Sequence, residues 1–137
     1  MASLQIKLPE EFILKLSRLG DKTDEIIPKV LKAGGEVVLD KVRANLKSSL
    51  SGKSTGQLER SLGLSPAKLN RKNEWDVKIG FAENRKDGKS NAMLANVLEY
   101  GKHNQPPRPF LKPARTQSRK AAIEAMKAKF ESEVESV

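Results

Sequence analysis

The sequence predicts an α+β fold in which a small antiparallel sheet or hairpin packs with a long helix in the N-terminal half and a C-terminal amphipathic helix. Three observations lead to this prediction. Apolar residues recur every three or four positions within residues 24–50 and again within residues 113–135, as on one face of a helix. Residues 75–81 instead alternate strictly between apolar and polar or small side chains, which is typical of a strand. A chain of 137 residues suits one domain with one modest core, so residues 1–137 are expected to form a single structural domain.

The first twenty residues contain a short strand pattern followed by a short helix pattern. Leu4, Ile6 and Leu8 alternate with polar residues, which predicts a strand. A helix is expected to open at Pro9, where the missing N–H does no harm, and to stop at Gly20.

The long helix is expected to begin between Asp24 and Pro28. One face carries apolar or small residues at steps of three or four, namely Ile27, Leu31, Gly34, Val38, Val42 and Leu46. Two adjacent glycines, Gly34 and Gly35, predict either a bend or the close approach of another backbone. The segment Lys47 to Gln57 is rich in Ser, Gly and Lys and is expected to be a mobile loop.

The middle of the chain predicts a β-hairpin. Leu62 and Leu64 alternate with small residues, and the run from Trp75 to Phe81 is the clearest strand pattern in the sequence. The polar residues 70–73 are expected to form the turn between the two strands. The charged segment Ala82 to Ser90 is expected to be a second mobile loop.

Two more helices are expected after this loop. Asn91 is predicted to cap a helix that ends at Gly101 and buries an inner stripe of Met93, Val97 and Tyr100. A proline-rich extended segment follows, and Pro113 is expected to open the last helix. The apolar stripe of that helix is predicted to comprise Ile123, Met126, Phe130, Val134 and Val137.

The composition excludes several classes of chemistry. The absence of cysteine excludes disulfides, thiolate metal sites and cysteine nucleophiles. Residues 52–55 resemble the end of a phosphate-binding loop, but Lys47 stands where that motif requires glycine. His103, the single histidine, lies in a polar loop without neighbouring ligands. We therefore predict no catalytic, cofactor-binding or metal-binding residues, no cofactor, and no enzymatic activity.

No segment approaches the length of a membrane-spanning helix, and the N-terminus lacks the apolar stretch of a signal peptide. We therefore expect no membrane association and synthesis in the cytoplasm.

The net charge of +9 is concentrated in two blocks. Residues 41–73 contain eight basic residues and one acidic residue, and residues 101–120 contain six basic residues and no acidic residue. Such blocks can face nucleic acid or an acidic protein surface, and they can equally be solvated faces without a partner.

Three segments of the chain carry a resemblance to a known family. They are residues 54–62 (STGQLERSL), residues 95–101 (ANVLEYG) and residues 108–114 (RPFLKPA). In this order and spacing they resemble the tail-completion or head–tail joining proteins of long-tailed bacteriophages, the gene-product-ten-like family of lambdoid phages. One position differs from the family pattern, because Lys102 stands where threonine is frequent after the Glu-aromatic-Gly segment.

The resemblance implies a virion structural protein of a phage or prophage, assembled in the bacterial host cytoplasm. It implies a homo-oligomeric ring, with a hexamer as the suggested size, that completes the tail or joins it to the head around the DNA path. The expected partners are other phage neck and tail proteins. The expected assembly residues are those of the three motifs, namely Thr55, Gly56, Leu58, Glu99, Tyr100, Gly101, Pro109, Phe110, Leu111 and Pro113.

Two questions stay open at the level of sequence. Phe110 and Leu111, held between prolines, are expected either to dock on a neighbouring subunit or to cover the core of their own. The basic blocks allow an alternative function, that of a small cytoplasmic non-enzymatic DNA-binding protein. The residues expected to face DNA are Lys47, Lys53, Lys102, Arg108, Lys112 and Arg115. In the ring they would contact phosphates without base readout.

Overall fold

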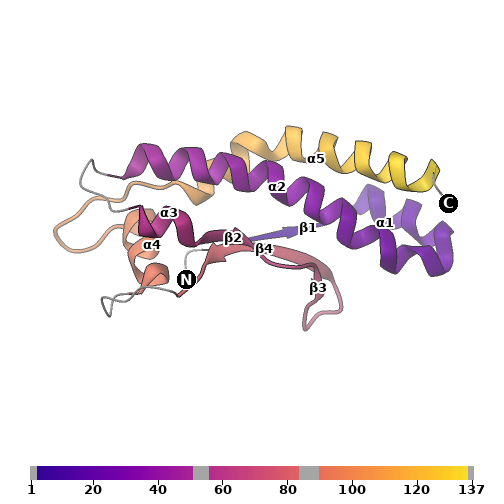
Figure 1. Cartoon of the computed structure of the whole chain (residues 1–137), viewed down its shortest axis with the longest axis horizontal. Helices are drawn as coiled ribbons and strands as arrows, with labels where there is room; N and C mark the ends of the chain where they lie inside the picture. The colour runs from indigo at the N-terminus through magenta and orange to yellow at the C-terminus, as the bar shows by residue number, and fades with distance from the viewer. Residues whose placement is uncertain (1–2, 51–55, 84–89, 136–137) are drawn as a thin grey trace.

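The computed structural model describes residues 3–50, 56–83 and 90–135 (Figure 1). Its elements in chain order are β1 (Leu4–Lys7), α1 (Glu10–Leu16), a 3₁₀ turn (Ser17–Lys22), α2 (Thr23–Ser49), α3 (Gln57–Ser61), β2 (Leu62–Leu64), β3 (Lys68–Leu69), β4 (Trp75–Phe81), α4 (Asn91–Tyr100) and α5 (Leu111–Glu135). The α+β class, the antiparallel sheet and the two long helices are confirmed.

The sheet has the order β1-β4-β2, and every pairing in it is antiparallel. Ile79 of β4 is the partner of Leu4 on one side and of Leu64 on the other. The predicted hairpin is confirmed, because β2 pairs with the end of β4 and the short strand β3 pairs with its beginning. Its turn lies where the sequence placed it, because the N–H of Asn73 donates to the carbonyl of Asn70 at 3.0 Å.

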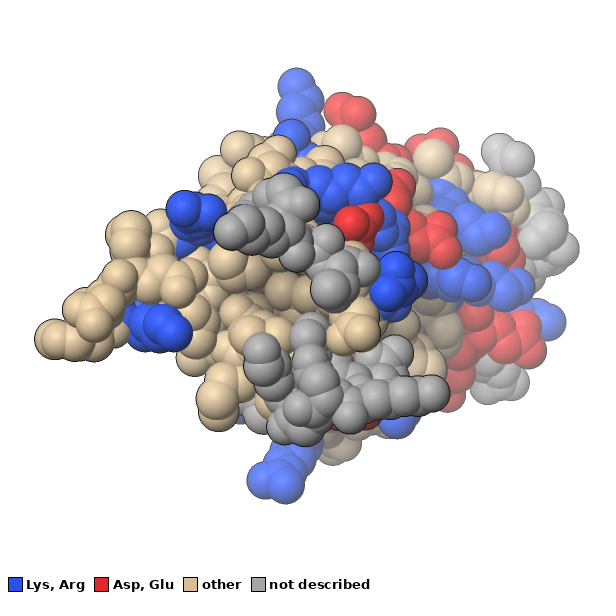
Figure 2. All heavy atoms as spheres, turned by 60° about the vertical axis from the view of Figure 1, so that its left-hand side comes forward, with Lys and Arg blue, Asp and Glu red and all other residues tan. Residues whose placement is uncertain are grey.

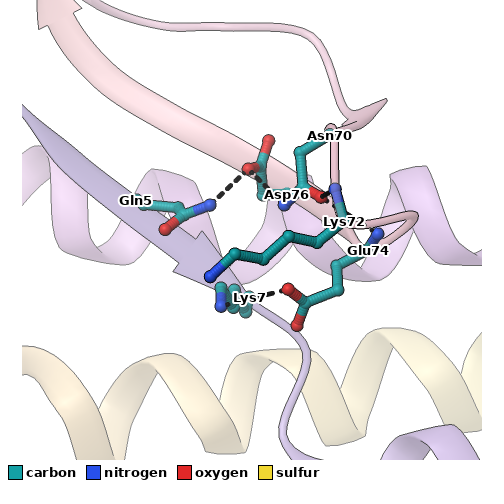
Figure 3. A network of polar contacts seen from close by, with 6 residues as sticks. All are labelled: Gln5, Lys7, Asn70, Lys72, Glu74 and Asp76. Carbon is teal, nitrogen blue, oxygen red and sulfur yellow. Dashed lines mark hydrogen bonds and ion pairs between the residues drawn. The ribbon is translucent and has the colours of Figure 1, made fainter.

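A polar network joins the hairpin turn to β1 on the outer face of the sheet (Figure 3). Asp76 accepts hydrogen bonds from the amides of Gln5 at 2.6 Å and Asn70 at 3.2 Å. Beside it, Lys7 pairs with Glu74 at 3.4 Å. Because Asp76 is buried, these two amide donors replace the water that its carboxylate loses.

The inner face of the sheet packs on α2, and α5 lies along α2 in the opposite direction (Figure 1). Polar contacts mark both ends of this helix pair. Lys29 donates to Glu133 at 3.2 Å, and this contact lowers the pKa of Glu133. At the other end Asn45 donates to Gln117 at 3.2 Å. The predicted apolar face of α2 is confirmed, since all six of its residues are buried.

The glycine pair of α2 permits close packing by side chains and not by a backbone. A Cβ placed on Gly34 would lie 2.2 Å from Cε of Met126 on α5. A Cβ on Gly35 would lie 3.0 Å from the methyl groups of Leu64. The two glycines therefore let α5 and the sheet approach α2 from different sides.

Several element boundaries differ from those expected. The helix α2 runs to Ser49, and α3 begins at Gln57, so both ends of the expected loop 47–57 are helical. The rest of that loop, residues 51–55, and the expected loop residues 84–89 lie outside the described residues. The last helix begins at Leu111, two residues before Pro113.

The predicted inner stripe of α4 is wrong. Met93 and Tyr100 are 67% and 66% exposed, whereas the helix buries Asn91, Ala95 and Glu99. The cap is also displaced by one residue, because the hydroxyl of Ser90 accepts the hydrogen bond from the N–H of Met93. The physical reason for the rotation is that Asn91 and Glu99 satisfy backbone groups inside the molecule, as described below.

In the described part of the chain no helix is long and apolar enough to span a membrane.

Candidate assembly site

One end of the molecule brings together the segments that carry the sequence motifs. It consists of the C-terminal part of α2, α3, α4, the loop 101–110 and the first turn of α5, and it is called the motif end below (Figure 1). Side chains from all of these elements, with Phe110 from the end of the loop, meet in one apolar cluster. Leu46, Leu58, Ala95 and Leu111 are members of it.

The carboxylate of Glu99 joins the second motif to the third. Glu99 is only 5% exposed, and its oxygens accept hydrogen bonds from the backbone N–H groups of Phe110 at 2.9 Å, Leu111 at 2.8 Å and Lys112 at 3.2 Å. These N–H groups open α5 and have no partner within the helix. A negative charge at this position also interacts favourably with the helix dipole. Glu99 therefore acts as an N-terminal cap supplied by another helix.

Gly101 permits the chain to turn back from α4 toward that cap. Its φ of 77° is one that side-chain-bearing residues rarely adopt. A Cβ there would also lie 2.7 Å from the carbonyl oxygen of Gln105. The turn is closed by a backbone bridge between Lys102 and Gln105, and the N–H of Arg108 then donates to the carbonyl of Leu98 at 2.6 Å. The Glu-Tyr-Gly order thus has a local structural cause.

Phe110 and Leu111 lie in the core of their own chain, which is the second of the two positions left open by the sequence. Phe110 is 0% exposed, and its ring meets that of Phe81 edge to face with centroids 6.0 Å apart. The amide of Asn45 donates to the carbonyl of Phe110 at 3.3 Å. Pro109 and Lys112 on either side remain exposed, so an interface role of this segment rests on them.

The first motif is built as a turn into α3. Thr55 lies outside the described residues, but Gly56 adopts the left-handed conformation directly before the helix, with φ 80°. Leu58 is buried in the apolar cluster, and the buried hydroxyl of Ser61 donates to its carbonyl at 2.7 Å. In the described part of this motif, glycine and leucine thus have structural roles.

What the motif end presents outward is an apolar stripe on α4. Met93 and Tyr100 are about two-thirds exposed, and the partly buried Val97 lies between them at helical spacing. Large apolar side chains grouped on a surface are typical of protein contacts. The sequence pattern identified these three residues but assigned them to the wrong face.

Basic side chains border the same end (Figure 2). Lys102, Arg108 and Lys112 are exposed, and within the described residues none of the three forms an ion pair. Lys47 lies close by but pairs with Glu59 at 3.4 Å. In Figure 2 the protruding end has blue side chains without red neighbours, whereas red and blue mix toward the opposite side.

The two basic blocks of the sequence do not form one continuous surface. Arg71 and Lys72 of the first block lie at the hairpin turn, away from the motif end (Figure 1). Lys53 lies outside the described residues. Arg115 stands about one turn further along α5 than Lys112 and lines a groove beside β1.

Glu83, which the sequence did not single out, holds the start of α4. Its carboxylate accepts from the N–H groups of Ala92 at 2.8 Å and Asn91 at 3.0 Å, and from the hydroxyl of Ser90 at 3.0 Å. These hydrogen bonds, led by that of Ala92, lower the pKa of Glu83. The amide of Asn91 donates in turn to the carbonyl of Ala82 at 2.7 Å. Because Glu83 lies seven residues before Ser90, no local capping pattern could have revealed it.

Among the described residues, no group of three His, Asp or Glu side chains could hold a metal ion. The motif end is therefore best described by its capped helices, its exposed apolar stripe and its basic rim.

A family model described as "Bacteriophage HK97-gp10, putative tail-component" matches residues 10–101, about two-thirds of the chain. The chain belongs to the HK97 gp10-like family. The match includes the first two motifs and ends at Gly101, so residues 108–114 lie beyond it. No curated protein and no solved structure matches the chain. This family of phage tail components is the one that the sequence motifs predicted.

Proposed function

We propose that this chain is a non-enzymatic structural subunit of a tailed-phage or prophage virion, which completes the tail or joins it to the head as one subunit of a ring around the DNA path. The observation that carries the proposal is the family match over residues 10–101. The fold supports it, because carboxylates hold the starts of α4 and α5 in place while α4 exposes large apolar side chains.

A ring requires two different surfaces on each subunit, because the contacts run head to tail. The exposed stripe of Met93, Val97 and Tyr100 is proposed as one of them. Tyrosine and methionine are enriched at protein interfaces, where the tyrosine hydroxyl keeps a polar partner while its ring is buried. Pro109 is exposed and follows Arg108, whose N–H donates to the carbonyl of Leu98 on α4, so it would extend the contact.

Particle assembly tests this role directly. A phage or prophage lacking the gene is complemented with the wild-type chain, with Tyr100→Asp, or with Leu69→Asp as a matched control on the hairpin. Leu69 is 54% exposed and lies on β3, away from the motif end (Figure 1). We expect Tyr100→Asp to fold normally but to leave unjoined heads and tails in electron micrographs, while Leu69→Asp restores joined particles. Full assembly with Tyr100→Asp would remove the stripe from the proposal.

The basic rim is proposed to face DNA that passes through the ring. Contacts with phosphates are independent of base sequence and weaken steeply as salt increases. We expect weak binding of the isolated protein to duplex DNA, with affinity falling at least tenfold between about 50 and 200 mM salt. The variant Lys102→Glu/Arg108→Glu/Lys112→Glu should lose most of this binding, whereas Arg71→Glu/Lys72→Glu at the hairpin turn should lose less.

The charge also supports the alternative of a DNA-binding protein that is not part of the particle. Fractionation separates the two functions. A virion subunit co-sediments with purified particles or tails, whereas a DNA-binding protein stays in the soluble fraction and shows strong differences between DNA sequences.

A further inference from the structure

The sheet is too narrow to cover both long helices. It is at most three strands wide, because β2 and β3 occupy the same side of β4 and β1 occupies the other. With strands about 4.8 Å apart, three strands span roughly 14 Å. Two packed helices, each about 10 Å across, span roughly 20 Å. The layer of α2 and α5 therefore has room for a fourth strand.

That room lies beside β1. The helix α2 packs under β4 and β2, whereas α5 contacts mainly β1 among the strands. Figure 3 shows β4 on one side of β1 and α5 on the other. A groove of about 410 Å³ follows this free edge. It is lined by residues 4–9 on the strand side and, on the helix side, by Val38, Arg115, Arg119, Ala122, Ile123 and Met126.

Among the described strands, β1 pairs only with β4, so its other edge offers unpaired main-chain groups. An edge strand directs alternate N–H and C=O groups away from its sheet, and an extended chain can bind them as an additional strand. Leu4 and Ile6 face the helix layer, since they pair with Ile79 and Val77 of the core. An added strand would continue this alternation and direct every second side chain onto α5.

The helix side of the groove carries a charge pattern that selects such a strand. Arg115 and Arg119 are exposed, and in the described parts of the chain neither has a carboxylate within ion-pair distance. They are four residues apart on α5, which places them about 6 Å apart along its axis. Side chains two positions apart on a strand are separated by about 6.7 Å. Two acidic residues at alternate positions therefore match the two arginines.

Beyond Arg119 the groove becomes apolar. Ala122, Ile123 and Met126 follow on the same side of α5, and the next alternate position of an added strand would meet them.

We propose that the groove between β1 and α5 binds an extended segment of a partner protein as a fourth strand, with two acidic side chains on Arg115 and Arg119 and an apolar side chain against Ile123 and Met126. Charge complementarity and the unpaired edge together favour a peptide over a nucleic acid. Phosphates could satisfy the arginines but not the alternating main-chain groups of β1. The proposal does not depend on ring formation.

Blocked eight-residue peptides test the site on the isolated protein. One carries Glu-Thr-Glu-Thr-Leu at its centre and the other the reverse order, because either strand direction can pair with β1. We expect one of them to bind and to shift the backbone amide NMR signals of residues 4–8. A version of that peptide with alternate main-chain nitrogens methylated should bind at least tenfold more weakly, because it cannot complete the ladder. A peptide concentration of about 1 mM is high enough to detect even a low-affinity complex. Absence of binding by both peptides at that concentration would overturn the proposal.

A matched pair of variants tests the charge contacts. We expect Arg119→Glu to weaken binding about tenfold, whereas Lys120→Glu, the same charge change one residue away and outside the lining of the groove, should weaken it less than twofold. A peptide with lysine in place of glutamate should bind Arg119→Glu better than wild type. Equal losses of peptide affinity in the two variants would contradict a peptide site. The same conclusion would follow if a duplex DNA oligonucleotide shifted the amide NMR signals of residues 4–8 as strongly as the peptide does. Loss of peptide binding would leave the particle assembly test unaffected, so the two proposals fail separately.

Discussion

The two ends of the helix pair are stabilised in different ways. At the motif end, apolar packing around Phe110 is combined with buried polar groups, among them Glu99 and Asn91. At the opposite end the core around Phe12 is apolar, with Phe12 and Phe130 in edge-to-face contact at 5.8 Å. The motifs lie at the end where buried polar groups hold loops and helix starts in place. Recognisable sequence patterns thus mark positions where side chains must satisfy particular backbone groups.

The largest expected effect compares the two cores through their phenylalanines. Phe110→Ala and Phe12→Ala should each lower the free energy of unfolding by about 3–5 kcal/mol, because both side chains are almost fully buried. Chemical denaturation of the monomer measures both. Such a loss would identify Phe110 as a core residue and leave the interface to exposed neighbours such as Tyr100. A stable, folded Phe110→Ala monomer that fails to assemble would instead restore Phe110 as an assembly residue.

The polar character of the motif end is tested at Glu99. Glu99→Ala should cost roughly 2–3 kcal/mol, because two buried N–H groups and one partly buried N–H group lose their acceptor. Glu99→Gln should cost less, since one amide oxygen still accepts part of these bonds. Thermal unfolding compares the variants, and hydrogen exchange at Phe110 and Leu111 locates the change. Equal stability of Glu99→Ala and wild type would show that water replaces the carboxylate and that the cap is dispensable.

Close packing along the helix pair is tested at Gly34. Gly34→Ala gains about 1 kcal/mol in helix propensity, but it forces Met126 to move, at a cost of about 1–3 kcal/mol. We therefore expect a net loss of stability by denaturation. The double variant with Met126→Ala should lose less stability than the sum of the two single losses, because the smaller side chain leaves room for the new methyl group. Additive effects of the two substitutions would show that they do not interact.

The elements with strong periodicity could be predicted from sequence, because α2 and β4 bury one clear apolar face. Periodicity failed at α4, where Met93 and Tyr100 are apolar but exposed. The inward face of that helix is determined by Asn91 and Glu99, whose partners lie nine or more residues away in the chain. The sequence predicted that Phe110 must be buried, but it could not predict which surface buries it. Local sequence patterns could not predict the caps formed by Glu83 and Glu99, because each of these caps connects separate elements of the chain.

The smallest expected effect concerns the other carboxylate cap, Glu83, which is exposed where Glu99 is buried. Hydrogen bonds from Ala92, Ser90 and Asn91 lower the pKa of Glu83 in the folded state. A lowered folded pKa means that the stabilisation is fully present above the pKa of the unfolded state, about 4.3, and is lost as the pH falls through the folded value. Glu83→Gln should therefore reduce stability modestly at neutral pH, and its difference from wild type should vanish in acid. Denaturation at a series of pH values measures this, with Glu124→Gln on the surface of α5 as the control. A difference between Glu83→Gln and wild type that persists unchanged below the folded pKa would show that the charge of Glu83 does not stabilise the start of α4.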